Sequence, residues 1–357
     1  DCAASGLRVT ADEVTLEGFT FEPDAAQTGD ARGLLVEAQG VRIADVTIEA
    51  VHGTALTLDG SSNTTIENVT TRATMAIDAT PAVKVRGSTA VEVDGLTIER
   101  HYQGLNGTVI GLNVESSSLI TLRALDISEI GHDPDAALGQ GLLPYHGLNA
   151  TAVYVANGNS IAFDDVMIFD IAGYCGEHGQ DNAKATGIAL TGCESCSISN
   201  ALFASLSGSS STGIGLNNSL GGGAHGIIVK DSNNLELADI QLAALHGGGG
   251  RDGGWGPSPT QADDVVGILL DGSDGARIDN LVVSDLRAGG HVNPDQPFDP
   301  DLSPHGASYG LRAENSADMV ASRLRMNGIG QKSLPLTGCP PGLAACVSLD
   351  GSTSAAV

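Results

Sequence analysis

A repeat of short apolar alternations runs through the whole sequence and limits the chain to a small set of folds. Each unit contains an apolar alternation, a break of Gly, Ser or Asn, and a second alternation, as in residues 267–286. When the units are aligned, the position of Ile278 is filled by Leu16, Ile43, Ile66, Val93, Leu122, Phe163, Ile198, Leu237, Ala321 and Val357. The position of Val283 is filled by Phe21, Ile48, Ile98, Ile127, Ile168, Phe203, Leu242 and Met326, with Thr71 the polar exception. Period-two runs of three to five residues between turn residues predict strands and not helices.

The spacing of the units predicts a solenoid. Successive units lie between 23 and 43 residues apart, and repeats of this length that are built from short strands are typical of stacked coils. The sequence resembles the right-handed parallel β-helix family, whose best-known members are pectin-lyase-like proteins, and the resemblance covers essentially the whole chain. It implies three strands in each coil. We therefore expect one all-β domain over residues 1–357, a single-stranded right-handed parallel β-helix of ten to eleven coils. Residues 1–130 would form short bare coils, and residues 131–357 would form coils with long Gly/Pro/Asp-rich loops on one edge.

Two polar columns accompany the apolar ones, and we interpret both as structural. One turn position is occupied by Ser61, Ser88, Ser117, Ser232, Ser273, Ser316 and Ser352, with Gly158 and Cys193 as substitutes. The bend between the second and third strands is occupied by Asp45, Asn68, Asp165, Asn200, Asp239 and Asn280, with Gly18 and Gly95 as alternatives. Asn, Asp and Gly tolerate a left-handed backbone, so this bend is expected to need one. Like polar side chains would then stack from coil to coil.

Charge and hydropathy exclude several classes of partner. The formal net charge is −26, which disfavours duplex nucleic acid and anionic membranes because both would repel the protein. No apolar run approaches the roughly 18 residues of a transmembrane helix, so no membrane span is expected.

The six cysteines favour an oxidising, extracellular compartment. Cys339 and Cys346 bracket one short loop and are expected to pair. Cys175 precedes the coil that carries Cys193 and Cys196, and it is expected to pair with one of these two. Cys2 is then left over, which hints at an intermolecular bond.

The outward positions of the first strand carry the best candidates for chemistry. Lys230, Asp271 and Glu314 occupy one outward column on three consecutive coils, and Arg312 lies in the neighbouring column, all within about 10 Å. The resemblance implies that polysaccharide-cleaving relatives use this face, lyases with calcium-binding carboxylates and a basic residue, hydrolases with a cluster of Asp. The alternative is that these charges are ordinary cross-strand pairs on a solvated sheet.

The sequence lacks the catalytic motifs of the best-known enzymes with this fold. The ordered motifs of polygalacturonase-like members and the Asp-His strand motif of pectate lyases are absent from the sequence. Asp residues in the expected loops, such as Asp295, Asp299 and Asp301, are compatible with calcium, but no cofactor is required.

Two functions follow from these observations. The missing catalytic motifs, the lack of capping helices at the coil ends and the leftover Cys2 favour a secreted or cell-surface structural or adhesive module. Such a module would self-associate end to end into a filament or surface layer. The alternative is a carbohydrate-active enzyme, a polysaccharide lyase or hydrolase, that acts on an acidic polysaccharide at the outward strand face.

Overall fold

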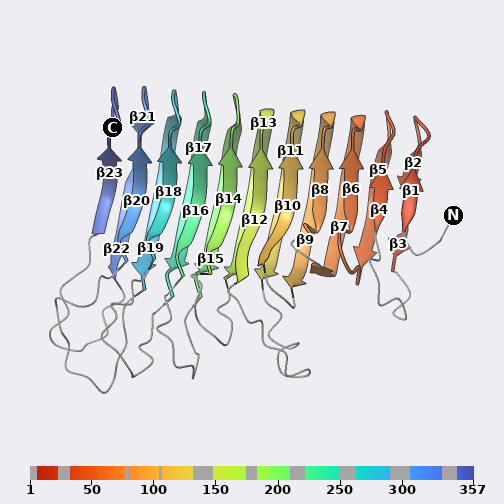
Figure 1. Ribbon diagram of the computed structural model, residues 1–357, viewed down its shortest axis with the longest axis horizontal. Helices are drawn as coiled ribbons and strands as arrows, with labels where there is room; N and C mark the ends of the chain where they lie inside the picture. Colours follow the sequence, from red (N-terminus) through yellow and green to blue (C-terminus); the bar gives the residue numbers. More distant parts are fainter. Residues whose placement is uncertain are drawn as a thin grey trace, which may run out of the picture.

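The computed structural model describes residues 6–22, 33–76, 80–103, 107–131, 148–173, 183–209, 222–248, 263–289, 306–331 and 344–357. These residues form stacked coils that lie side by side along one axis, from the N-terminal coil at the right of Figure 1 to the C-terminal coil at the left. All strand pairs are parallel, and each strand pairs with its counterpart in the next coil. The fold is the predicted right-handed parallel β-helix. Most of the segments predicted as long loops lie outside the described residues.

The first strand of every coil belongs to an eleven-stranded sheet, called sheet A here. In order it contains β1 (Leu7–Val9), β4 (Leu34–Val36), β6 (Leu56–Asp59), β8 (Val83–Arg86), β10 (Gly107–Glu115), β12 (Leu148–Ala156), β14 (Ala185–Thr191), β16 (Ala224–Lys230), β18 (Val265–Asp271), β20 (Ser308–Glu314) and β23 (Ala344–Asp350).

The second and third strands of the coils form the twelve-stranded sheet B. It contains β2 (Thr15–Glu17), β5 (Arg42–Glu49), β7 (Ser62–Ala76), β9 (Thr89–Gln103), β11 (Ser118–Gly131), β13 (Asn159–Ala172), β15 (Ser197–Ser207), β17 (Glu236–His246), β19 (Arg277–Ala288) and β21 (Val320–Ser322). Two shorter strands complete it, β3 (Thr20–Phe21) beside β5 and β22 (Arg325–Gln331) beside β19.

The observed register confirms the two apolar columns. Ile278 pairs with Leu237 and Ala321, and Val283 pairs with Leu242 and Met326, as the alignment of repeats predicts. These side chains belong to one continuous apolar core that extends along the stack, in which Phe163 and Phe203 are among the largest fully buried residues. Inward-facing aliphatic side chains of successive coils therefore pack on one another, and this stacking stabilises the rod.

Residues with positive φ bend the chain at the predicted corner between the second and third strands. The φ angles are 51° at Asp45, 49° at Asn68, 56° at Asp165 and 54° at Asn280. The Asn68 amide donates to the Asp45 carboxylate at 3.1 Å, so neighbouring bends are also linked by their side chains. The requirement for a left-handed backbone at this column is confirmed.

The serine column forms a hydrogen-bonded ladder. The hydroxyl of Ser88 accepts from the Ser61 N–H at 3.2 Å, and the hydroxyl of Ser117 accepts from the Ser88 N–H at the same distance. Cys193 fits the same ladder, because its N–H donates to the Ser232 hydroxyl at 2.9 Å. The structural interpretation of this column is confirmed.

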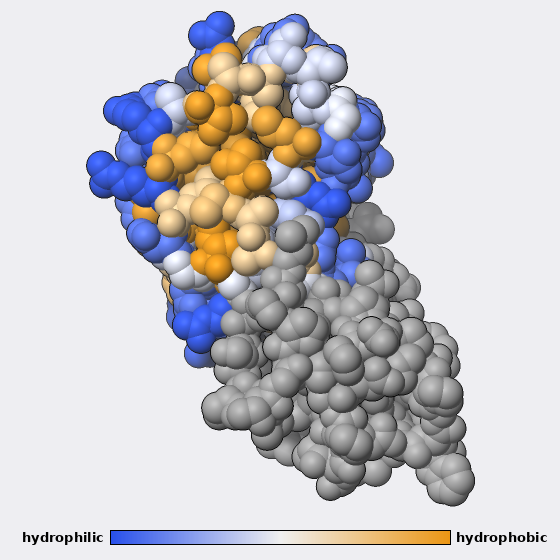
Figure 2. Space-filling model, turned by 90° about the vertical axis from the view of Figure 1, so that its left-hand side faces the viewer, coloured by the Kyte–Doolittle hydropathy of each residue, from blue (hydrophilic) through white to orange (hydrophobic). Residues whose placement is uncertain are grey.

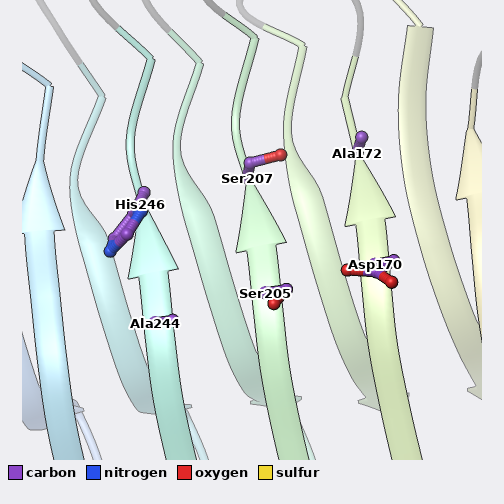
Figure 3. Close-up of a pocket in the computed structure, with 6 residues that line it drawn as sticks. All are labelled: Asp170, Ala172, Ser205, Ser207, Ala244 and His246. Carbon is purple, nitrogen blue, oxygen red and sulfur yellow. The ribbon is translucent and has the colours of Figure 1, made fainter. Parts of the chain in front are cut away.

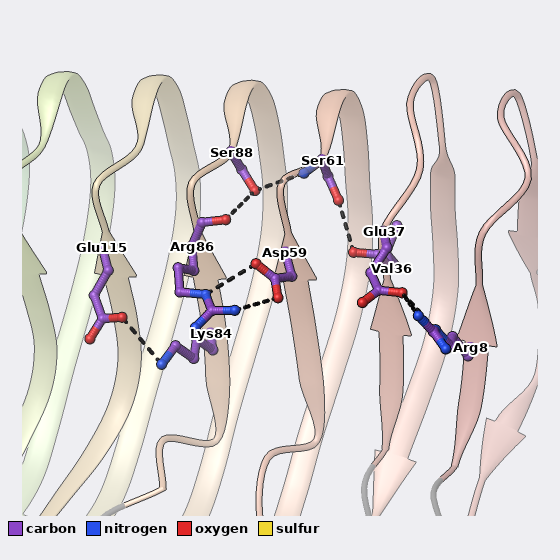
Figure 4. A network of polar contacts seen from close by, with 9 residues as sticks. All are labelled: Arg8, Val36, Glu37, Asp59, Ser61, Lys84, Arg86, Ser88 and Glu115. Carbon is purple, nitrogen blue, oxygen red and sulfur yellow. Dashed lines mark hydrogen bonds and ion pairs between the residues drawn. The ribbon is translucent and has the colours of Figure 1, made fainter.

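Charged side chains pair across the N-terminal half of sheet A (Figure 4). Arg86 contacts Asp59 at 2.6 Å, and Lys84 contacts Glu115 at 3.2 Å. In this half the outward charges are thus the ordinary cross-strand pairs that the sequence allows.

Three of the six cysteines lie in the described residues, and no disulfide joins any two of them. Cys193 and Cys196 are buried, and Cys346 is exposed. Cys2, Cys175 and Cys339, the other cysteines of the predicted disulfides, lie outside the described residues. The pairing scheme therefore stays a prediction.

The C-terminal coil presents apolar side chains at the end of the rod (Figure 2). Large apolar residues that are exposed in this region include Val320, Leu349 and Val357. Self-association through the coil ends stays a prediction. Among the described residues, no helix is long and apolar enough to cross a membrane.

Candidate functional site

The outward face of sheet A in its C-terminal half brings the four predicted candidates together. Lys230, Asp271 and Glu314 are register partners on β16, β18 and β20. Arg312 lies two residues before Glu314 and pairs with it. The side chains of Lys230 and Asp271 form no ion pair or hydrogen bond with other described residues, and their backbone carbonyls accept from the hydroxyls of Ser232 and Ser273. The positions agree with the sequence analysis, and the chemical role of these residues stays a prediction.

A column of core-facing glycines runs through sheet A, and two residues that directly precede these glycines face outward. At Gly226 an added Cβ would lie 2.6 Å from the Gly267 carbonyl oxygen and 2.6 Å from Leu242 Cδ2, so this position faces the core. Successive side chains of a strand point to opposite faces, so His225, the residue before Gly226, faces outward. In β20 Tyr309 occupies the equivalent position.

Tyr309 is the centre of a small apolar cluster that is separate from the core. It packs with Val266 and Ala307, and Leu269 and Ala345 lie against them. The Arg312 guanidinium carbon lies 4.7 Å from the centroid of the Tyr309 ring, which is a cation–π contact. Tyr309 is only 8% exposed, and this burial is the main reason that its pKa is raised, followed by the negative charge of Asp264. The phenol is therefore protonated at neutral pH.

His225 is buried and has an unused ring nitrogen. It is 7% exposed, and its Nδ1 has no hydrogen-bond partner within the part of the chain that the structure describes. Burial, and to a smaller extent the positive charges of Lys184, Lys230 and Arg312, lower the pKa of His225 to about 3. The imidazole is therefore neutral at neutral pH.

Two aspartates before β18 hold the cationic side chains in place. Asp264 contacts the Arg312 guanidinium at 2.8 Å, and its other oxygen accepts from the Ala307 N–H at 2.8 Å. Asp263 pairs with Lys184, which precedes β14, at 3.2 Å. Because Asp264 also fixes the backbone before β20, it links the position of Arg312 to that of Tyr309.

The site differs electrostatically from the rest of the molecule. Its charged members are the cations Lys184, Lys230 and Arg312 and the anions Asp263, Asp264, Asp271 and Glu314. The whole chain has 17 Lys and Arg against 43 Asp and Glu, so this face is far less negative than average. An anionic ligand meets three cations on this face, of which Lys184 and Arg312 are paired with aspartates and Lys230 is not.

Sequence reasoning missed His225, Tyr309 and the aspartates before β18. A usable signal was present, because a glycine follows both His225 and Tyr309 at the same place in the repeat. Asp263 and Asp264 belong to a segment that we expected to be a loop. Calcium stays a prediction, and no cluster of three His, Cys, Asp or Glu suited to a metal occurs within the described ranges.

Comparisons with known proteins identify similar folds only. No family model matches the sequence, and no curated protein sequence matches it. A solved periplasmic alginate epimerase, AlgG, is 11% identical, with 91% of this chain and 70% of that chain covered and a TM-score of 0.34. The catalytic domain of an α-1,3-glucanase in complex with nigerose is 12% identical, with 99% of this chain covered and a TM-score of 0.36.

The chain spans 60% of the length of that glucanase domain. The A-module of a mannuronan C-5 epimerase from Azotobacter vinelandii is 14% identical, with 96% of this chain and 91% of that module covered and a TM-score of 0.28. The sheet topology described above, and not these comparisons, establishes the architecture: the chain has the right-handed parallel β-helix fold.

Proposed function

We propose that the protein is an extracellular carbohydrate-active enzyme that cleaves an acidic polysaccharide on the outward face of sheet A, by the elimination chemistry of a lyase. The observation that carries the proposal is His225, whose buried Nδ1 has no hydrogen-bond partner among the described residues and lies on the face that also bears Lys230 and Arg312. Tyr309, a protonated phenol, lies two coils away on the same face.

The residues match the steps of such a reaction. Arg312 and the two lysines bind the substrate carboxylate and stabilise the negative charge that develops on it. His225 takes the proton from the carbon next to the carboxylate, and the electron pair forms a carbon–carbon double bond as the glycosidic C–O bond breaks. Tyr309 donates its proton to the departing oxygen. The products are a new chain end and an unsaturated sugar, and no water is consumed.

A hydrolase is the second form of the same proposal, and it fits less well. It would need one carboxylic acid and one carboxylate on either side of the scissile bond. Asp271 and Glu314 are neighbours in register, but Glu314 is paired with Arg312. That ion pair favours the ionised form of Glu314 and makes it a poor proton donor.

A purely structural rod, which the sequence analysis favoured, does not account for this face. A buried polar atom without a partner costs stability, and such atoms occur both at His225 and in the N-terminal coils, at Thr64, Thr71, Asn113 and Asp126. Ion pairs join outward charges in both halves of sheet A (Figure 4 shows the N-terminal half), but in the C-terminal half the side chains of Lys230 and Asp271 have no such partner among the described residues.

The test is an assay on a panel of polysaccharides, polygalacturonate, polymannuronate and polyguluronate beside uncharged dextran, following the ultraviolet absorbance of the unsaturated product. We expect turnover of an acidic polymer only. His225→Ala and Tyr309→Phe should each lower kcat about 100-fold or more. Arg86→Met removes a cation of the paired half of the same sheet and should leave kcat unchanged.

Three results would argue against the proposal. The first is that no acidic polymer is cleaved. The second is that His225→Ala cleaves as well as the wild type. Reducing ends that appear without an unsaturated product would replace the lyase by the hydrolase.

A further inference from the structure

A hollow lies on the outward side of sheet B, away from the candidate site on sheet A (Figure 3). It crosses β13, β15 and β17 and has a volume of about 290 Å³. Its lining consists of Asp170, Ala172, Ser205, Ser207, Ala244 and His246. None of these residues belongs to the candidate site on sheet A.

Small side chains create the hollow. In one row across the coils Ala172, Ser207 and His246 are successive register partners. In the row before it, Asp170, Ser205 and Ala244 all occupy bends with positive φ, between 54° and 56°. Alanine and serine leave room between the larger side chains of Asp170 and His246, which therefore stand at opposite ends of the hollow (Figure 3).

The polar groups of the hollow are available to a ligand. The side chains of Asp170, Ser205 and Ser207 form no hydrogen bond or ion pair with other described residues. His246 is oriented by Asp285, whose Oδ2 lies 3.2 Å from Nε2, and its Nδ1 has no partner in the described ranges. The hollow thus offers two hydroxyls, one carboxylate and one imidazole nitrogen within three coils.

Apolar surface lies on the same face. Met167 and Leu202 are register partners on β13 and β15, and they are 45% and 40% exposed. Each precedes a lining residue of the hollow by three positions. These two side chains offer apolar contacts beside the polar groups of the hollow.

We propose that this hollow binds an uncharged sugar, as a glycan-binding site separate from the reaction on sheet A. A sugar presents hydroxyl groups to Asp170, Ser205, Ser207 and His246, while its C–H faces suit the neighbouring apolar side chains. Asp170 and the net charge of −26 disfavour an anionic ligand, and no Lys or Arg lines the hollow. The volume lies at the lower end of small-molecule sites, about 300–1,000 Å³, so the site holds a short glycan unit.

The experiment is ligand-observed NMR with methyl glucoside, methyl galactoside and N-acetylglucosamine, followed by calorimetry of the best ligand. The protein carries His225→Ala, so that the result does not depend on activity at sheet A. We expect millimolar binding of at least one uncharged sugar, unchanged between low and high salt. Ala172→Leu fills the hollow and should weaken binding at least tenfold. Thr97→Leu, on the same outward face of β9, is the matched control and should bind like the parent.

Several outcomes would overturn the inference. One is that none of the three sugars binds. Another is that Ala172→Leu binds as well as Thr97→Leu, with both variants shown by circular dichroism to be folded. A third is that galacturonate binds more tightly than the uncharged sugars. Cleavage of an acidic polymer by the wild type is measured separately, so failure of the glycan site leaves the proposed lyase untouched.

Discussion

Arg312 lies over the ring of Tyr309, with the guanidinium carbon 4.7 Å from the ring centroid. The two residues are three positions apart on β20, and in a regular strand they would point to opposite faces. Gly310 removes this conflict. A Cβ there would lie 2.5 Å from Met326 Sδ, so the glycine faces the core, and Leu311, which follows it, is fully buried as well. Two successive inward residues put Tyr309 and Arg312 on the same outward face.

Replacing Arg312 by lysine tests whether the site needs only the positive charge or also the planar guanidinium group. Lysine keeps the positive charge but loses the planar group that contacts Asp264 and Glu314 while covering the Tyr309 ring. We expect kcat/KM on the cleaved polymer to fall about 100-fold with little change in thermal stability. Arg86→Lys is the control, since it alters the ion pair with Asp59 in the other half of sheet A. Equal activity of Arg312→Lys and wild type would contradict the role given to the guanidinium.

Gly226→Ala should damage the site through the backbone. The added Cβ meets the Gly267 carbonyl oxygen and the Leu242 side chain, so the strand must shift beside His225. We expect a loss of about 1–3 kcal/mol in the free energy of unfolding, together with loss of cleavage. Gly330→Ala is the matched control, because nothing lies within 4 Å of a Cβ at that position. Urea denaturation and the cleavage assay measure the two effects, and a fully active, fully stable Gly226→Ala variant would show that the close approach is unimportant.

The register of the coils was predictable because it depends on local periodicity alone. Ile278 and Val283 face inward for the same reason as their equivalents in every other coil, so aligning the repeats gives the strand pairing directly. Lys230, Asp271 and Glu314 were found in the same way. His225 and Tyr309 were missed because strict alternation does not predict that two successive residues after each of them face the core. This irregularity places them on the same outward face as the candidate charges. The hollow at Asp170 and His246 was missed because it depends on small side chains that meet only across three coils.

At the bend between the second and third strands, positive φ and the side-chain hydrogen bond should make separate contributions to the free energy of unfolding. Asn68 has a φ of 49°, and its amide donates to Asp45. Asn68→Ala loses the hydrogen bond and is strained at positive φ, so we expect destabilisation of about 2 kcal/mol. Asn68→Gly loses only the hydrogen bond and should cost clearly less. Chemical denaturation of both variants decides this, and an Asn68→Gly variant less stable than Asn68→Ala would disprove the requirement for positive φ.

A buried histidine should make the rod less stable in mild acid. His101 is fully buried on β9, where Nε2 donates to the Thr80 carbonyl at 3.0 Å and Nδ1 contacts the Thr74 hydroxyl at 2.6 Å. Burial lowers the pKa of His101 to about 4 in the folded protein, while the ordinary value is about 6.5. Between these values the unfolded chain binds the proton and the folded chain does not. The contribution of His101 to stability is therefore fully present above pH 6.5 and is lost as the pH falls toward 4.

Linkage sets the size of this effect and provides its test. One such group changes the free energy of unfolding by at most about 1.4 kcal/mol per pH unit, or roughly 3 kcal/mol over the whole window. His101→Gln cannot titrate there, so its stability should fall less steeply between pH 6.5 and 4 than that of the wild type. The remaining slope includes His225, whose pKa is lowered to about 3 by burial and nearby cations. The His101→Gln,His225→Gln double variant should therefore have a flatter profile than either single variant, as urea denaturation at a series of pH values would reveal. Parallel profiles for the wild type and His101→Gln would mean that His101 binds a proton equally well in the folded and the unfolded chain. That result would contradict the lowered pKa of His101 in the folded protein.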